Sequence, residues 1–258
     1  MNRFTIDFDA DTWMMPLRKE LGDLLPNDIE AVLRSAAPKF VEDARDILYR
    51  ASSDPEALID RSIDWVKGSD VLAFHGTRLT DIEANKLWQS GLRALDIQDR
   101  IDWIFRTVPD LADALAQHEA IKLAHSHSMG NRGGQVHLAI SRQFTQLGYD
   151  YHREGSEFDR RLLQFAGLDH LLPQLTQRGR SWLVSIRLSG GQALDGMHPF
   201  FPIEYTREND RYPNLVRELL EELAWQMHRP GSPRRPIDSC FMLRASLPGS
   251  SVEAVEPI

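Results

Sequence analysis

The sequence predicts an α+β fold, with a small split sheet of antiparallel or mixed strands and an N-terminal helical block. Apolar residues recur at three- and four-residue spacing over the first quarter of the chain, which is the period of helices. Short apolar runs bounded by turn residues follow residue 70 and are typical of strands. Strands interspersed with helices favour an α+β domain around one sheet. We therefore expect residues 1–68 to form a helical block that docks on a main domain of residues 69–258.

Three helices are predicted in the N-terminal block, because apolar residues fall on one helical face in each and prolines separate them. They span Ile29–Ala36, Phe40–Tyr49 and Pro55–Val66. A core built from these segments alone would be small and marginally stable. Docking on the following domain is therefore the favoured interpretation, with an independent small core as the alternative.

A strand, a turn and a helix are predicted between Val71 and Leu92. The apolar run Val71–Phe74 suits a buried strand. Thr80 followed three residues later by Glu83 forms a capping box that starts a helix, and Gly91 is typical of a helix end. The helix should pack back on the strand and present the intervening turn at the edge of the sheet, where ligands are commonly held. This turn contains His75, Gly76, Thr77 and Arg78.

The rest of the chain alternates between predicted helices and strands. Helices are expected at Ile101–Thr107, Leu111–His125 and Leu215–Met227, and strands at Val136–Ser141, Trp182–Leu188 and Cys240–Ala245. Alternation along the first of these strands places His137 on the face opposite Val136 and Leu138. The segment from Glu157 to Phe165 fits a helix or a strand.

Composition narrows the function classes. The formal charge of −8 and the pI near 5.6 oppose broad nucleic-acid binding but permit a local basic patch. Cys240 is the single cysteine, which excludes an internal disulfide and a multi-cysteine zinc site. Five histidines do not form a convergent ligand set by their spacing, so no metal site is expected: His118, His125, His127, His137 and His152.

The absence of a long apolar run predicts a protein that does not engage membranes, located in the cytoplasm or secreted as an effector.

Three segments in order resemble the motifs of the ADP-ribosyltransferase superfamily, which includes poly(ADP-ribose) polymerase-like enzymes and RNA 2′-phosphotransferases of the same fold. The first is His75-Gly76-Thr77 between a strand and a helix. The second is the strand from Gly134 to Ser141, and the third is Gly155-Ser156-Glu157. The resemblance implies a split sheet of the ADP-ribosyltransferase type and NAD as co-substrate.

The resemblance also implies roles for individual residues around NAD. His75 is expected to hold a ribose hydroxyl and the backbone at Gly76 to grip the nicotinamide amide, with Thr77 and Arg78 as hydroxyl and pyrophosphate contacts. His137 stands where poly(ADP-ribose) polymerase-like members usually carry a tyrosine that stacks on the nicotinamide. The remaining contacts implied for the cofactor are Ser141, after that strand, and Tyr151, which is a substitute for the stacking tyrosine.

Glu157 is the predicted catalytic carboxylate, acting with His75 and His137. Breaking the bond between nicotinamide and ribose develops positive charge on the sugar, and a nearby carboxylate stabilises that charge. The structural alternative is a glutamate at a helix start, because Ser156 before it suits a helix N-cap. Glu154 is the first alternative for the catalytic role.

The leading hypothesis is an NAD-dependent transferase that moves ADP-ribose to a protein or nucleic-acid acceptor, as a toxin, effector or phage-defence enzyme does. An antitoxin or immunity protein would then be a natural partner. The second hypothesis is an NAD-dependent RNA 2′-phosphotransferase, for which Arg78, Arg132 and Arg142 are phosphate-binding candidates. The third is an inactive module of the same fold that binds ADP-ribose, a nucleotide or a partner protein.

Overall fold

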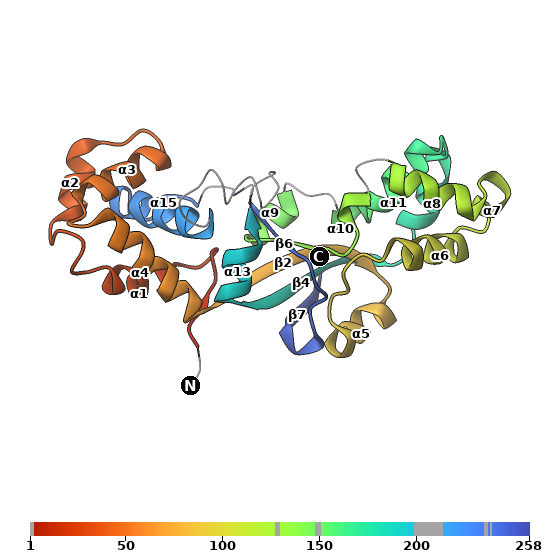
Figure 1. Cartoon of the computed structure of the whole chain (residues 1–258), viewed down its shortest axis with the longest axis horizontal. Coiled ribbons are helices and arrows are strands. Elements are labelled where there is room, and N and C mark those ends of the chain that lie inside the picture. Colours follow the sequence, from red (N-terminus) through yellow and green to blue (C-terminus); the bar gives the residue numbers. More distant parts are fainter. Residues whose placement is uncertain (1–2, 127–129, 148–150, 199–213, 235–236, 238) are drawn as a thin grey trace. The chain divides into compact units, whose positions relative to one another are not determined.

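The computed structural model describes residues 3–126, 130–147, 151–198, 214–234, 237 and 239–258 of this α+β protein (Figure 1). The chain forms two compact units. The first comprises Met1–Ala73 and Arg187–Phe241, and the second comprises Phe74–Ile186 and Met242–Ile258. The helical block predicted over residues 1–68 therefore lies within the first unit, together with a later part of the chain.

The first unit is mainly helical. Its helices are α1 (Met14–Glu20), α2 (Ile29–Ala36), α3 (Val41–Ala51), α4 (Pro55–Lys67), α13 (Gly190–Gly196) and α15 (Asn214–His228), with the 3-10 turn η1 (Asp11–Trp13) and the short strands β1 (Thr5–Ile6) and β5 (Met197–His198). The three predicted helices of the block are confirmed to within two residues at each end. Helix α15, in blue in Figure 1, packs against α2, α3 and α4 despite their distance in sequence.

Helix α15 also buries charge. Glu221 is 3% exposed and accepts a hydrogen bond of 2.7 Å from Arg45 of α3. Glu222 is fully buried and lies 3.8 Å from Arg234 Nη1. Buried carboxylates are tolerated when a cation and hydrogen bonds accompany them, so this side of α15 joins α3 and the following segment electrostatically.

The sheet contains β2 (Asp70–Leu79), β3 (Val136–Ala139), β4 (Arg180–Ser189), β6 (Cys240–Leu243) and β7 (Val252–Pro257) in addition to β1 and β5. Hydrogen bonds connect the strands in the order β5-β6-β3-β2-β4-β7, and β1 pairs with β2 in parallel. The pairs β2–β3, β4–β7 and β5–β6 are antiparallel. Phe74 is the partner of Ala139, so the two strands with histidine motifs are neighbours.

Strand β2 is longer than predicted, because residues 75–78 continue the strand and do not form a turn. The reason is long-range pairing, because β2 lies between β3 and β4 in the sheet. Side chains add contacts at this end of the strand: Trp182 Nε1 of β4 donates to Leu79 O at 3.0 Å, and Arg78 Nη2 donates to Gly179 O at 2.8 Å. The turn comes only at Thr80, where the next helix begins.

Helix α5 (Asp81–Ser90) confirms the predicted start and end. Glu83 N donates to Thr80 Oγ1 at 3.3 Å, and Thr80 N donates to Glu83 Oε2 at 2.9 Å, which together form the capping box. Gly91 has φ of 67°, and a Cβ there would lie 1.8 Å from Leu247 O. Only glycine fits that position. The helix packs through Ala84 and Leu87, which are buried, whereas Trp88 is 49% exposed.

The other helices of the second unit are α6 (Ile97–Thr107), α7 (Leu111–Ala114), α8 (Gln117–Ser126), α9 (Arg142–Leu147), α10 (Tyr151–Glu154), α11 (Glu157–Phe165) and α12 (Leu172–Thr176), with 3-10 turns η2 (Gly130–Arg132), η3 (Asp169–Leu171) and η4 (Gly249–Ser251). Helices α6, α8 and α11 share a hydrophobic cluster that includes Ile101, Ala120 and Leu162. The helix predicted at Leu111–His125 is broken, because Leu115 is extended with φ of −144° and ψ of 126°. The segment that fitted a helix or a strand, from Glu157, is α11.

Two later strands end earlier than predicted. Strand β3 ends at Ala139, because Ser141 O accepts hydrogen bonds from both the amide and the hydroxyl of Thr145 and so starts α9. Strand β6 ends at Leu243. The predicted alternation along β3 is confirmed, since Val136 and Leu138 are buried and His137 is partly exposed.

Candidate functional site

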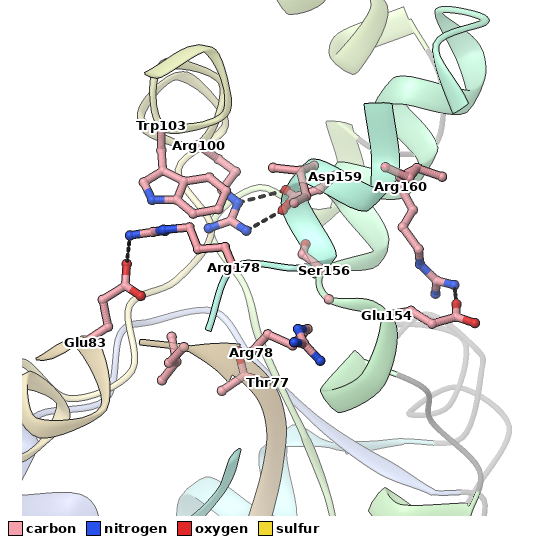
Figure 2. A pocket seen from close by; sticks show the side chains of 14 residues that line it. Thr77, Arg78, Glu83, Arg100, Trp103, Glu154, Ser156, Asp159, Arg160 and Arg178 are labelled. Atoms are coloured by element: carbon pink, nitrogen blue, oxygen red, sulfur yellow. Dashed lines mark hydrogen bonds and ion pairs between the residues drawn. The ribbon is translucent and has the colours of Figure 1, made fainter. Parts of the chain in front are cut away.

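A small polar pocket lies in the second unit and has a volume of about 90 Å³ (Figure 2). Thr77 and Arg78 at the end of β2 line it, with Trp103 from α6 and Ser156 before α11. About 10–15 Å³ of such space accommodates one water molecule. The pocket therefore has room for a small polar group and not for a whole nucleotide.

The pocket is rich in charge. Its lining contains four arginines and three carboxylates: Arg78, Arg100, Arg160, Arg178, Glu83, Glu154 and Asp159. Three arginine–carboxylate pairs form across it, drawn as dashed lines in Figure 2. Arg100 binds Asp159 through two hydrogen bonds, Arg178 Nη2 lies 2.8 Å from Glu83 Oε1, and Arg160 pairs closely with Glu154. One positive charge in the lining thus has no matching carboxylate.

That charge is on Arg78. Its Nη1 donates to Arg153 O at 3.1 Å and its Nη2 to Gly179 O at 2.8 Å. Its Nε is buried and has no hydrogen-bond partner. Main-chain carbonyls orient the guanidinium but do not cancel its charge, and a guanidinium has five N–H donors in total. Arg78 is therefore held in place with donors left for a ligand.

Trp103 stabilises two of the paired arginines. The guanidinium carbon of Arg100 lies 3.9 Å from the centre of its ring, and that of Arg178 lies 5.0 Å away. Contacts of this length between a cation and an aromatic ring are favourable. Asp159 is 5% exposed at its side chain, and although burial alone would lower the pKa of Arg100, the charge of Asp159 raises it. Arg100 in this wall of the pocket therefore stays charged.

Glu83 has a double role. Its Oε2 accepts from Thr80 in the capping box, and its Oε1 accepts from Arg178. Burial alone would raise the pKa of Glu83, but the hydrogen bonds from Thr80 and the charge of Arg178 outweigh it, so the pKa is lowered. The helix start of α5 is thus tied to the pocket.

The structure brings together two of the predicted site residues that are 62 positions apart in sequence. His75 Nδ1 lies 2.9 Å from the main-chain oxygen of His137. A carbonyl oxygen only accepts, so His75 Nδ1 carries the proton and Nε2 of the neutral ring is an acceptor. His137 Nε2 in turn donates to Gln135 Oε1 at 3.1 Å. Thr77, which lines the pocket, shares its face of β2 with His75 by strand alternation.

Burial lowers the pKa of His75 below its ordinary value of 6.5, and the hydrogen bond to His137 O, which favours the charged ring, does not compensate. We expect the free energy of unfolding to fall as pH drops below about 6.5, because the unfolded chain then binds a proton that the folded chain excludes. His75→Gln should remove this component, whose slope is at most about 1.4 kcal/mol per pH unit. Urea denaturation of both proteins between about pH 7 and pH 5 measures the difference. Parallel pH profiles would contradict the assignment of a partly buried, neutral His75.

The remaining predicted cofactor contacts have other neighbours. A Cβ on Gly76 would lie 3.0 Å from Thr145 Cγ2 and 3.4 Å from His152 Cβ, so this glycine lets α9 and α10 approach β2. Ser141 is 4% exposed and begins α9. Tyr151 is the first residue of α10, and the description of that position is limited to its backbone. Thr145 of α9 and His152 of α10 therefore pack against β2 at Gly76.

The two candidate carboxylates have different surroundings. Glu157 begins α11, and its side chain is 14% exposed. Its Oε2 lies 2.5 Å from Arg132 and its Oε1 2.6 Å from Arg161, so both oxygens are engaged by arginines outside the pocket. Glu154 lines the pocket, is 49% exposed and pairs with Arg160 alone among the described cations. The geometry therefore favours Glu154 for contact with a ligand.

Several pocket residues were not anticipated from sequence: Arg100, Trp103, Asp159, Arg160 and Arg178. A weak signal exists for two of them, because Arg100 and Trp103 are spaced three residues apart on an amphipathic helix. No cluster of metal-ligating side chains occurs within the described ranges. No helix in that same part of the chain is long and apolar enough to cross a membrane.

Comparisons with models of protein families, with curated proteins and with solved structures give no match.

Proposed function

We propose that this protein is an NAD-dependent transferase that moves ADP-ribose to a macromolecular acceptor, with a split sheet of the ADP-ribosyltransferase type. The observation that carries the proposal is the contact between His75 and His137 on adjacent strands. Motif segments far apart in sequence meet there, as a shared binding site requires. The pocket lies two residues further along β2, at Thr77, which is roughly 7 Å by strand geometry.

His75 is suited to hold a ribose. The hydrogen bond from Nδ1 to His137 O holds the neutral ring in one tautomer, so Nε2 can accept a hydrogen bond from a hydroxyl group. Such a contact exists in the ground state and in the transition state, so it contributes mainly to affinity.

Glu154 is the carboxylate that we assign to the developing sugar cation. It lines the pocket, and its half-exposed side chain leaves it accessible to a ligand. A preorganised charge facing the reacting carbon lowers the barrier in the way that glycoside hydrolysis uses carboxylates. Glu157, with both oxygens held by arginines, is the alternative assignment.

Incubation of the full chain with NAD labelled in the adenylate portion, together with a cell lysate, tests the proposal. We expect a labelled protein or nucleic acid and stoichiometric release of nicotinamide. His75→Ala should raise the apparent KM for NAD by at least as large a factor as it lowers kcat. Absence of both label transfer and nicotinamide release in the unaltered protein would overturn the proposal.

A second candidate function is removal of an RNA 2′-phosphate with NAD, favoured by the unmatched charge of Arg78 in the pocket. Arg132 and Arg142, the other predicted phosphate contacts, are engaged with Glu157 and Glu256 respectively. An oligonucleotide with an internal 2′-phosphate, incubated with and without NAD, separates this activity from label transfer to the lysate.

A further inference from the structure

Charge is distributed unevenly between the two units. Residues 74–186 and 242–258 hold 14 lysines and arginines against 15 aspartates and glutamates, a formal charge of −1. The remaining −7 of the chain's −8 therefore belongs to the first unit. The acidic average of the whole chain does not oppose anion binding in the second unit, where the arginine-rich pocket lies.

Arg78 supplies a fixed positive charge to the pocket. Arg78 keeps two N–H groups on main-chain carbonyls, which leaves about three of its five donors, including the buried Nε, without a partner. The other three arginines of the pocket are matched by carboxylates. An anion that entered would therefore meet one fixed cation and no unpaired acid within the lining.

The N-terminus of α11 adds a partial positive charge to the pocket. Ser156 is the N-cap residue, and its side chain makes no capping hydrogen bond to the helix. Ser156 therefore supplies no side-chain acceptor to the first amides of α11, a nine-residue helix, and the helix dipole favours an anion at that end. Gly155 and Ser156 both line the pocket. Figure 2 shows Ser156 and Arg78 as part of the same lining.

The size of the pocket selects the anion. A volume of about 90 Å³ suits a single tetrahedral oxyanion with a few water molecules. Forked guanidinium donors and helix N-termini both match phosphate oxygens.

We propose that the pocket between Arg78 and the start of α11 binds one phosphate group of a ligand. The group belongs either to the pyrophosphate of NAD or to a phosphorylated acceptor. Phosphate binding does not depend on NAD turnover, so this site can be tested whether or not the transferase proposal holds.

Inorganic phosphate is the first probe. Titration calorimetry on the full chain, in a chloride buffer of constant ionic strength, should show saturable binding to one site. Arg78→Gln should weaken it by roughly tenfold or more, since a charge-assisted bond is lost. Arg93→Gln, which changes an exposed arginine of the same unit, is the control for net charge and should bind phosphate as the unaltered protein does.

Two matched substitutions at Ser156 test the same site if Arg78→Gln fails to fold. Aspartate and asparagine are both good N-caps, so each should preserve α11. Ser156→Asp places its own carboxylate at the site and should weaken phosphate binding by roughly tenfold or more, while Ser156→Asn should change it little. No saturable binding in the unaltered protein, or equal affinity of the two Ser156 variants, would overturn the proposal.

Competition with inorganic phosphate identifies the source of the group. Displacement by ADP-ribose assigns the site to NAD, whereas displacement by a nucleoside 2′-monophosphate, and not by the nucleoside, assigns it to the acceptor. Nicotinamide, which lacks phosphate, should displace nothing. Displacement by the nucleoside or by nicotinamide would contradict a phosphate site.

Discussion

Glu154→Gln is expected to slow nicotinamide release from NAD by roughly a hundredfold or more, while the protein stays folded and binds NAD with little change. Glutamine keeps the shape of the side chain but removes the charge proposed to face the developing sugar cation. Glu154 is half exposed and has one described cation partner, Arg160, so its loss should cost little stability. Single-turnover kinetics at saturating NAD, together with calorimetric measurement of the affinity for NAD, separate the chemical step from binding.

Glu157→Gln is the matched comparison. It removes the same charge three residues further on, where two arginines hold the carboxylate outside the pocket. We expect a lower free energy of unfolding, by about 1 to 3 kcal/mol, and nicotinamide release within a few-fold of the unaltered enzyme. A hundredfold slower reaction in Glu157→Gln and an unaffected rate in Glu154→Gln would reverse the assignment and identify Glu157 as the catalytic carboxylate.

Asp159→Ala is expected to lower the free energy of unfolding by about 3 to 5 kcal/mol. Asp159 is 5% exposed at its side chain and binds Arg100 of α6 through two hydrogen bonds. Truncation leaves the partly buried guanidinium of Arg100 without its counterion, and such a charge costs more than the pair contributes. Urea denaturation measures the total effect, and hydrogen exchange of the amides in α6 and α11 should show where the protection is lost.

Asp169→Ala is the control for this experiment, because Asp169 is an exposed acid of the same unit at the start of η3. Its effect should stay within about 0.5 kcal/mol. If Asp159→Ala were equally mild, the pair with Arg100 would be a surface contact, and the wall of the pocket that contains Trp103 would not depend on it.

The four arginines of the pocket fall into two groups, according to whether a carboxylate or a main-chain carbonyl holds them. Three arginines are neutralised by carboxylates and fix α5, α6, α10 and α11 in place around it, whereas Arg78 is oriented by main-chain carbonyls and keeps its charge. Variants of the paired arginines should therefore affect folding and binding together. Arg78→Gln and Ser156→Asp act on the proposed phosphate group more selectively.

Local sequence is enough to predict the helices and strands whose ends depend on adjacent residues. The capping box of Thr80 and Glu83 and the left-handed Gly91 delimit α5 because these interactions lie within one helical turn. Alternation along β3 was also sufficient to place His137 opposite the buried Val136 and Leu138.

Tertiary structure decided where strands end and which side chains share the site. Strand β2 continues to Leu79 between β3 and β4, and the indole of Trp182 on β4, 103 positions later, donates to Leu79 O; no local pattern reveals these partners. Arg178 reaches Glu83 across 95 positions, and Arg100 reaches Asp159 across 59, so the walls of the pocket exist only once the chain returns on itself. Glu154 and Glu157 are separated by less than one helical turn of sequence. Whether each faces the pocket or two arginines depends on the direction in which α11 leaves the turn at Gly155, and packing of its apolar side on the helical cluster sets that direction.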